Sequence, residues 1–394
     1  MNLELLAKSV QDYINANLNA DVNQIALAKS KFEGVTSAEL AGQILSKKKS
    51  EKKLPTWFQT PGIYYPPALS IEQTSSETTA QYKSKLAIGN TLIDLTGGFG
   101  IDAYYFAKQV PAVTHCEINP ELSEIARHNA KKLGSPSIHF EAVDGIEFID
   151  KGTQQYDTIY VDPARRANKG KVFMLKDCTP DVTANLDLLL QKSQRIIIKT
   201  APLLDITAGL NELKCVSEIH IVSVKNECKE LLWIIDKRFS GQPEITAVSL
   251  NEKEKAFIFE KSKSNVDATF INDLSDVRYL YEPDAALLKS GAFNLIAVRY
   301  QLVKLHPQTQ LYGSKKINKD FPGRIFEIKD QLTAADLKKV NNLTGNVLVR
   351  NYPAKPEDLV KKYKITPNHD LFFIFTKVAN GDNIIIKASI IQHY

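Results

Sequence analysis

The segment from Thr91 to Lys108, TLIDLTGGFGIDAYYFAK, constrains the fold more than any other part of the chain. A short apolar run leads into a glycine-rich turn, and residues with helical spacing follow. Gly98, Gly100 and Ala103 match the spacing G-x-G-x-x-G/A, in which glycine permits positive φ and lets a ligand approach the backbone. The segment therefore predicts a strand, a nucleotide-binding turn and a helix.

Short β-rich runs alternate with helical stretches from this segment to about residue 238. Alternation of this kind predicts a doubly wound α/β fold, with a mostly parallel sheet and helices on both faces. The last two runs are joined by the short segment KNECKE, so we expect them to form an antiparallel hairpin. The expected strands cover residues 91–95, 113–118, 138–143, 156–162, 195–201, 217–224 and 231–236.

The regions on either side of this sheet have different patterns. Residues 1–53 place apolar side chains such as Val10, Ile14 and Ile44 at helical spacing and then run into KKKSEKK, which predicts a helical cap and a basic linker. We expect the α/β domain to cover residues 54–238. Runs such as NLIAVRYQL and LFFIFTKV are expected to be strands of two small α+β modules, a ferredoxin-like one at 239–322 and a second at 323–394.

Composition excludes several classes of protein. Apolar residues make up 43% and charged residues 24% of the 394 residues, as in ordinary globular proteins. No apolar run approaches the ~18 residues of a membrane span, and the N-terminal segment lacks a signal-peptide core. The four cysteines are far apart and form no CxxC pair, and the histidines show no metal-ligand spacing. We therefore expect a cytoplasmic protein with reduced thiols and without a metal; its oligomeric state stays open.

The positive charge is concentrated in the C-terminal part. The net charge is +5, and residues from Phe239 onward hold 22 Lys/Arg against 17 Asp/Glu, whereas the first 238 residues balance at 28 each. Basic surfaces attract phosphate backbones through counterion release. The C-terminal part is therefore a candidate nucleic-acid-binding region.

Three acidic residues end three successive predicted strands. Asp94 can bind a ligand's amino group, Glu117 can accept hydrogen bonds from two ribose hydroxyls, and Asp144 can bind the adenine amino group. Each acid alone also fits a helix N-cap. Together they suit adenosine on a cationic methionine tail, whereas Asp94 would repel the pyrophosphate of an oxidoreductase dinucleotide. The candidate cofactor-binding residues are Asp94, Thr96, Gly97, Gly98, Gly100, Glu117, Ile118, Asn119, Asp144 and Gly145.

The segments DLTGGFGID, CEINP, AVDGIEF and VDPAR resemble motifs I to IV of class I S-adenosylmethionine-dependent methyltransferases. The form D-x-T-x-G-x-G-x-D is similar to motif I of bacterial small-subunit rRNA guanine-N2 methyltransferases. The whole chain resembles a bacterial group of methyltransferases with a THUMP-like C-terminal domain. This resemblance implies a seven-stranded Rossmann-like methyltransferase sheet, S-adenosylmethionine as cofactor and RNA binding by the THUMP-like module. Thr96 departs from the usual glycine; its hydroxyl either bonds the cofactor or caps the turn.

The segment VDPARR follows the fourth strand, where this fold keeps its substrate. The resemblance to [D/N]-P-P-aromatic implies that Asp162 and the Pro163 carbonyl accept hydrogen bonds from an exocyclic amine. Arg165 replaces the aromatic residue and could stack on a base or pair with a phosphate. The alternative is an N-capping aspartate followed by proline in the first helical turn. We take Asp162, Pro163 and Arg165 as candidate catalytic residues.

Further residues are candidates for contacts around the same cleft. Lys199 ends the fifth strand and faces the cleft, and Phe173 could replace the missing aromatic side chain. The candidate substrate-binding residues are Arg166, Lys169, Phe173 and Lys199. The segment before motif I offers lid residues or, equally, an ordinary helix N-terminus; they are Gln73, Ser75, Ser76 and Thr79.

These observations predict a methyltransferase that acts on structured RNA, on a base amino group such as guanine N2. One alternative is a methyltransferase of a protein or a small molecule. Another is a non-catalytic RNA-binding protein on a methyltransferase scaffold. The intact Asp94, Glu117 and Asp162 argue against the non-catalytic alternative.

Overall fold

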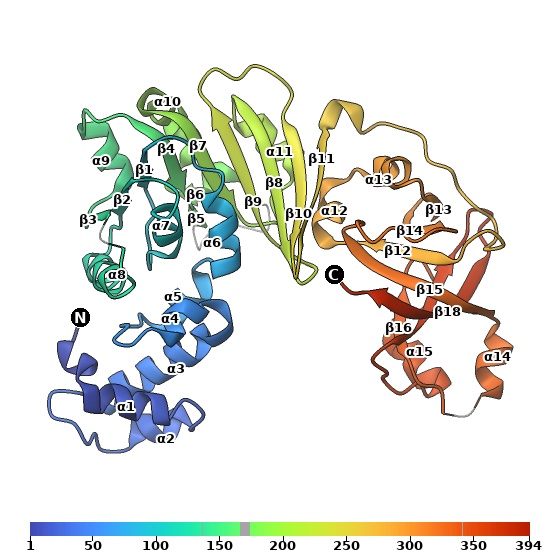
Figure 1. The fold of residues 1–394 in the computed structure, drawn as a ribbon, viewed down its shortest axis with the longest axis horizontal. Coiled ribbons are helices and arrows are strands. Elements are labelled where there is room, and N and C mark those ends of the chain that lie inside the picture. The colour runs from blue at the N-terminus through green and yellow to red at the C-terminus, as the bar shows by residue number, and fades with distance from the viewer. Residues whose placement is uncertain (136, 166–173, 341) are drawn as a thin grey trace. The chain divides into compact units, whose positions relative to one another are not determined.

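The predicted strand, turn and helix are present as β1 (Thr91–Asp94), the turn at 95–100 and α7 (Ile101–Phe106). The computed structural model describes residues 1–135, 137–165, 174–340 and 342–394 (Figure 1). Two structural units divide the chain. The first consists of Met1–Ser217 and Leu232–Gly241, and the second of Glu218–Leu231 and Gln242–Tyr394.

The first unit is built around a parallel sheet. Its strands β1, β2 (Ala112–Cys116), β3 (Ile138–Glu141), β4 (Tyr156–Val161) and β7 (Ser193–Thr200) lie in the order β7-β4-β1-β2-β3. All four neighbouring pairs are parallel. The chain order reverses between β1 and β4, and ligands of doubly wound folds bind at the carboxyl ends of the strands at that point.

Helices connect these strands as the alternating pattern predicts. They are α8 (Pro120–Lys132), α9 (Gly145–Lys151), α10 (Val182–Lys192) and α11 (Ile206–Glu212). Because helices cover both faces of a parallel sheet, its strands are apolar on both sides. Ile196, Ile197 and Ile198 of β7, for example, are all fully buried.

The N-terminal residues form a helical cap, which extends from the predicted residues 1–53 to residue 84. Its helices are α1 (Lys8–Ala16), α2 (Val22–Leu27), α3 (Ser37–Lys53), α4 (Pro55–Gln59), α5 (Ala68–Gln73) and α6 (Glu77–Ser84). The lysine-rich segment is not a linker, because residues 47–53 form the C-terminal half of α3.

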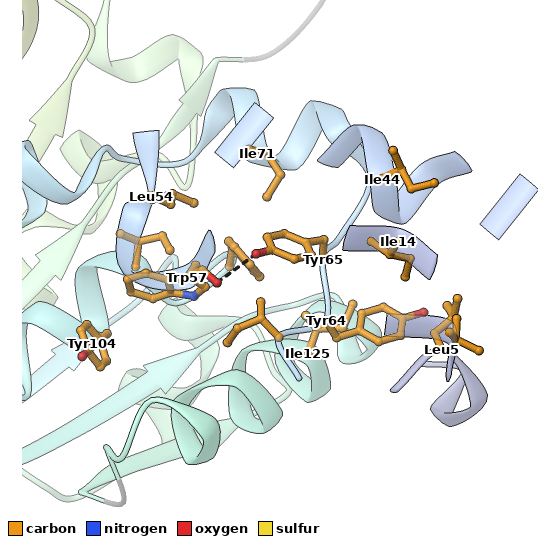
Figure 2. Packing of buried hydrophobic residues seen from close by; sticks show 14 of the residues in the cluster. Leu5, Ile14, Ile44, Leu54, Trp57, Tyr64, Tyr65, Ile71, Tyr104 and Ile125 are labelled. Atoms are coloured by element: carbon orange, nitrogen blue, oxygen red, sulfur yellow. Dashed lines mark hydrogen bonds between the residues drawn. The ribbon is translucent and has the colours of Figure 1, made fainter. Parts of the chain in front are cut away.

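The cap and the motif I region share one hydrophobic core. Trp57 of α4 packs against Tyr104 of α7 in an edge-to-face arrangement, with ring centroids 4.9 Å apart, and also contacts Phe99 of the glycine turn. Ile125 of α8 belongs to the same cluster, and the Tyr65 hydroxyl donates a 2.9 Å hydrogen bond to the Trp57 carbonyl (Figure 2). The cap is therefore packed directly onto the turn that the sequence assigns to the cofactor.

The second unit begins within the expected hairpin. Lys225 and Asn226 both have positive φ and connect β8 (Val216–Val224) to β9 (Glu227–Asp236), as in a type I′ turn. Strand β10 (Glu244–Leu250) pairs in parallel with β8 and antiparallel with β11 (Glu254–Glu260).

A seven-stranded sheet forms most of the second unit, in the order β13-β14-β12-β15-β18-β17-β16. Its strands are β12 (Tyr279–Pro283), β13 (Val303–His306), β14 (Thr309–Ser314), β15 (Gly323–Leu332), β16 (Asn346–Val349), β17 (Leu371–Lys377) and β18 (Asn383–Gln392). The helices are α12 (Ala285–Ser290), α13 (Phe293–Tyr300), α14 (Ala334–Lys339) and α15 (Pro356–Tyr363).

One expected strand of this unit is wrong. NLIAVRYQL forms most of α13 instead, with Leu295, Ile296 and Ala297 buried on consecutive positions. A short apolar run cannot be assigned to a strand or a buried helix by periodicity alone, and here packing decided in favour of the helix.

Candidate cofactor and acceptor site

The glycine turn after β1 combines a closely packed side with an open one. A Cβ atom on Gly97 would lie 2.3 Å from Nε2 of His115, so no larger residue fits there without a shift. Gly98 has a φ of 54°, and a Cβ on it would meet only the Thr96 carbonyl oxygen, at 3.8 Å. The turn thus packs against His115 on one side and leaves space beside Gly98 for a ligand.

Asp94 lies at the end of β1 beneath this turn and is only 1% exposed. Its Oδ1 accepts a 3.0 Å hydrogen bond from the Thr96 amide. Burial raises the pKa of Asp94 well above its usual value, and the nearby charges of Asp102, Asp162 and Glu117 raise it further. This concentration of carboxylates favours a cationic ligand such as a sulfonium over an anionic one.

Glu117 follows β2 and connects two motifs. Its Oε2 accepts a 2.9 Å hydrogen bond from the Gly98 amide, and its Oε1 accepts a 2.8 Å bond from the Asn119 amide. A carboxylate has about four acceptor sites, so Glu117 retains acceptor capacity for hydroxyl groups. Asn119 caps α8 through the Glu121 and Leu122 amides, and Ile118 is 69% exposed between them.

Asp144 follows β3 and is an N-cap, the structural alternative considered from the sequence. Its Oδ1 accepts hydrogen bonds from the Ile146 and Glu147 amides, at 2.8 and 3.0 Å. The next residue, Gly145, lies against motif I, because a Cβ there would be 2.5 Å from the Leu95 carbonyl oxygen. Motifs I, II and III are thus brought together at the carboxyl edge of the sheet.

Thr96 connects motif I to motif IV. Its Oγ1 accepts a 2.7 Å hydrogen bond from the Asp162 amide and lies 3.4 Å from the Asp94 carboxylate. The Thr96 hydroxyl therefore bridges the ends of β1 and β4, which a glycine at this position could not do.

Asp162 is also ion-paired with Lys199, and the side chains are 30% and 17% exposed. Their charged atoms, Oδ2 and Nζ, are 2.5 Å apart. The sheet register explains the pairing. Val161 of β4 lies opposite Ile198 of β7, and Asp162 and Lys199 are the residues that come directly after them. The structure thus brings together two residues that the sequence assigned to catalysis and to substrate contact separately.

The remainder of motif IV is described only in part. Pro163 is buried, and Ala164–Arg165 form β5, which pairs with β6 (Cys178–Thr179). Arg166, Lys169 and Phe173 lie outside the described residues. Their predicted contacts with a substrate, and that of the Arg165 side chain, stay predictions.

The segment before motif I is tied to α7 by Ser75, one of the proposed lid residues, and by other residues that the sequence analysis missed. Ser75 donates a 2.8 Å hydrogen bond to Asp102 Oδ2, and the Tyr160 hydroxyl donates one of 2.9 Å to the same oxygen. The fully buried Lys83 lies 3.1 Å from Asp102 Oδ1. Asp102 is the last residue of the motif D-x-T-x-G-x-G-x-D, and its place in that motif was the sequence signal that could have identified it as part of the site.

The other proposed lid residues lie around this network. Ser76 caps α6 by accepting a 3.2 Å hydrogen bond from the Thr79 amide, so the ordinary helix N-terminus is present. Gln73 is the last residue of α5. The segment is thus held by hydrogen bonds at both Ser75 and Ser76.

His115 on β2 was also missed as part of the site. It is fully buried beneath Gly97, and burial lowers its pKa to about 4. The imidazole is therefore neutral at physiological pH and adds no positive charge beneath the turn.

Two wider properties bear on the sequence predictions. In the second unit, the exposed His369, Asp370 and His393 hold their potential ligand atoms within 4.8 Å of one another, a proximity that spacing along the chain did not reveal.

Across residues 1–135, 137–165, 174–340 and 342–394, no helix has the length and apolar character needed to traverse a bilayer.

Comparison with known proteins places these features in a wider context. A family model described as a ferredoxin-like domain matches residues 279–322, and one described as THUMP domain-like matches residues 323–389. A protein from Porphyromonas gingivalis W83, described provisionally as a methyltransferase, has a similar crystal structure. The two sequences are 30% identical, the TM-score of the two structures is 0.85, and the match covers 99% of this chain and 98% of that one.

Curated relatives are more distant. An uncharacterised S-adenosylmethionine-dependent methyltransferase of Mycobacterium tuberculosis is 22% identical over 320 residues, which cover 79% of this chain and 84% of that protein. A 23S rRNA (uracil(747)-C(5))-methyltransferase of Yersinia enterocolitica is 28% identical over 159 residues, 38% of this chain and 41% of the relative.

Proposed function

Because the chain belongs to the S-adenosylmethionine-dependent methyltransferases with a THUMP-like C-terminal domain, we propose that it methylates a base amino group of structured RNA. The cofactor of this family is S-adenosylmethionine. The proposal therefore concerns the acceptor and the roles of individual residues.

The observation that carries the proposal is Asp162 at the end of β4, whose backbone amide donates to the Thr96 hydroxyl and whose carboxylate is ion-paired with Lys199. When bound, S-adenosylmethionine supplies a methyl group already activated by a cationic sulfonium. Asp162 and the Pro163 carbonyl accept the N–H groups of an exocyclic amine and so direct the nitrogen lone pair toward that methyl group. Correct placement of two reactants can account for a large share of the rate enhancement in such a displacement. Asp162 then accepts the proton that the methylated nitrogen loses.

The cofactor roles follow the positions of the strand-end acids. Asp94 binds the ammonium group of the methionine tail, Glu117 binds the ribose hydroxyls, and the second carboxylate oxygen of Asp144 accepts the adenine amino group. The open space beside Gly98 suits a ligand that approaches the backbone closely. Ile118, exposed beside Glu117, packs against the adenine ring.

Lys199 supports an amine rather than a ring carbon as the acceptor. A pyrimidine C5 atom becomes nucleophilic only after an enzyme nucleophile adds to the ring. The residue that faces Asp162 from the neighbouring strand is an ion-paired ammonium, which has no lone pair to add. An exocyclic amine needs no such activation, because its nitrogen attacks directly.

The RNA part of the proposal is supported by the second unit and by the relatives. Residues 323–389 match the THUMP domain-like model, and residues from Phe239 onward hold the whole excess of positive charge. The relative from Yersinia enterocolitica is named as an rRNA methyltransferase. A strongly salt-dependent interaction with RNA is therefore expected.

The test is transfer of labelled methyl from S-adenosylmethionine to total RNA from cells that lack the protein. We expect label with the wild type, no label with Asp162→Ala, and normal label with Asp187→Ala, which changes an exposed aspartate on α10 as a matched control. Digestion should then yield a base methylated on an amino nitrogen. Calorimetry should show S-adenosylhomocysteine affinity within a few-fold in all three proteins.

Three results would count against parts of the proposal. Absence of label in RNA with intact cofactor binding would move the acceptor to a protein or a small molecule. Full activity of Asp162→Ala would remove the assigned role of Asp162. A C-methylated pyrimidine in the digest would refute the amine acceptor.

A further inference from the structure

Lys47 is a buried lysine in the segment that the sequence suggested as a basic linker. It lies on α3, and only 7% of its surface is exposed. Its Nζ lies 5.5 Å from the centroid of the Phe58 ring. A lysine in the middle of a helix face that packs inward requires an explanation, since lysine is rarely buried unless it is paired.

No carboxylate compensates the charge of Lys47 within the described part of the chain. Its ammonium makes no salt bridge or hydrogen bond there and lies over the face of the Phe58 ring. Burial accordingly lowers the pKa of Lys47, with no neighbouring charge raising it. An ammonium that is partly withdrawn from water without a partner costs free energy, and an anion that binds beside it from the cavity offsets that cost.

The space in front of Lys47 is large enough for such a ligand. It is a cavity of about 540 Å³, lined by α1, α3, α4 and the end of α8. Lys8 and Lys132 add two further ammonium groups, against one carboxylate, Asp12. Asn15, Gln59 and Thr60 supply neutral hydrogen-bonding groups at the same cavity.

This combination matches the chemistry of a phosphate ester. A phosphate group accepts several hydrogen bonds and binds lysine as a point charge, while amides and hydroxyls satisfy its remaining oxygens. The volume exceeds what inorganic phosphate alone occupies and lies within the usual range of small-molecule sites. The apolar wall formed by Leu6, Phe58 and Pro61 can cover the remainder of a nucleotide.

The cavity is separate from the cofactor site. Helix α8 begins beside Glu117, where Asn119 is its N-cap, and ends at Lys132, which lines the cavity. Thirteen residues of α-helix span roughly 20 Å at 1.5 Å per residue. The Lys132 end of the cavity therefore lies roughly 20 Å from the Asn119 end of α8, and no candidate cofactor residue lines the cavity.

We propose that this cavity is a second ligand site, which binds the phosphate group of a nucleotide, either free or at the end of an RNA strand. Lys47 is its central cation, and Lys8 and Lys132 complete the charge. The proposal does not depend on which acceptor the enzyme methylates.

The experiment is calorimetric titration of the full-length protein with UMP, uridine and inorganic phosphate, in saturating S-adenosylhomocysteine so that the cofactor site is filled. We expect UMP to bind at least about tenfold more tightly than either uridine or phosphate. Lys47→Met should weaken UMP binding at least about tenfold, and the matched control Lys52→Met, an exposed lysine on the same helix, should leave it unchanged. A short RNA with and without a 5′-phosphate then distinguishes a strand end from a free nucleotide.

Several outcomes would overturn the proposal. They are absence of UMP binding, equal affinity for UMP and uridine, and equal losses in Lys47→Met and Lys52→Met. Because an unpaired and partly desolvated charge is removed, Lys47→Met should melt no lower than the wild type without ligand. If that variant does not fold, Lys132→Met provides the same test from the edge of the cavity, with a smaller loss of UMP affinity expected and an unchanged affinity contradicting the site.

Discussion

The ion pair between Lys83 and Asp102 should contribute strongly to the stability of the first unit. Lys83 is fully buried on α6, and the Asp102 side chain on α7 is 11% exposed. The pair connects the segment before motif I to the helix that follows the glycine turn. Removing one charge while leaving the other buried is among the most destabilising kinds of substitution.

The structure predicts different magnitudes for the two partners. Asp102→Leu removes the carboxylate from the Lys83 ammonium, which stays buried with the Ser75 hydroxyl oxygen 2.8 Å away, and this should cost about 3–5 kcal/mol of unfolding free energy. Lys83→Met leaves Asp102 with two donors, the hydroxyls of Ser75 and Tyr160, so about 2–3 kcal/mol is expected. The double variant removes both charges and should lie within about 2 kcal/mol of the wild type.

Differential scanning calorimetry of the full chain measures these effects. For a unit of this size each kcal/mol shifts the melting temperature by roughly 2–4 °C, so Asp102→Leu should lower the transition of the first unit by roughly 10 °C. Lys52→Met, which removes an exposed lysine, controls for the loss of a positive charge. A double-mutant cycle then gives the coupling energy between the two residues.

The reasoning fails if the losses of the two single variants add in the double variant. Additivity would mean that the two residues stabilise the unit independently and that their proximity has no energetic consequence. It also fails if Lys83→Met is more destabilising than Asp102→Leu, because the two hydroxyl donors would then not compensate the carboxylate.

Two further predictions concern His115. Gly97→Ala places a Cβ 2.3 Å from the His115 ring, so the affinity for S-adenosylhomocysteine should fall at least about tenfold in calorimetry. Adding His115→Ala should restore much of that affinity. If the double variant does not recover affinity, the assigned clash is wrong. Burial lowers the pKa of His115 to about 4, against an ordinary 6.5, so the unfolded chain binds the proton first as the pH falls. Between pH 7.5 and 5.0 the wild type should lose about 2 kcal/mol more stability than His115→Phe in denaturant titrations, and equal losses would refute the assignment.

The core of the α/β fold could be predicted because its signals are local. The turn after Asp94 needs glycine at particular positions, and the carboxyl ends of parallel strands meet at one edge of the sheet. Those two rules were enough to collect Asp94, Glu117, Asp144 and Asp162 at one site. They carry no information on which side chains at that edge bond to one another, so the bridge from Thr96 to Asp162 had to come from the structure.

The features that the sequence did not predict depend on packing between distant segments. The run NLIAVRYQL has β-branched and apolar residues typical of a strand, but burial of consecutive side chains made it α13. A lysine run such as 47–53 indicates a solvated segment, and only the approach of α4 and α8 makes Lys47 a buried residue. Asp102 and Lys83 are 19 positions apart, and nothing in that separation indicates an ion pair.

The core shared by the cap and motif I has a consequence for synthesis on the ribosome. The cap residues up to Ile71 leave the ribosome first, but Tyr104, Tyr105 and Ile125 complete their hydrophobic cluster. At 5–20 residues per second, the 54 residues between Ile71 and Ile125 take roughly 3–11 s to be translated. During that interval Trp57 and its neighbours lack their partners, so the nascent cap is a site where a chaperone that binds apolar segments would engage the chain.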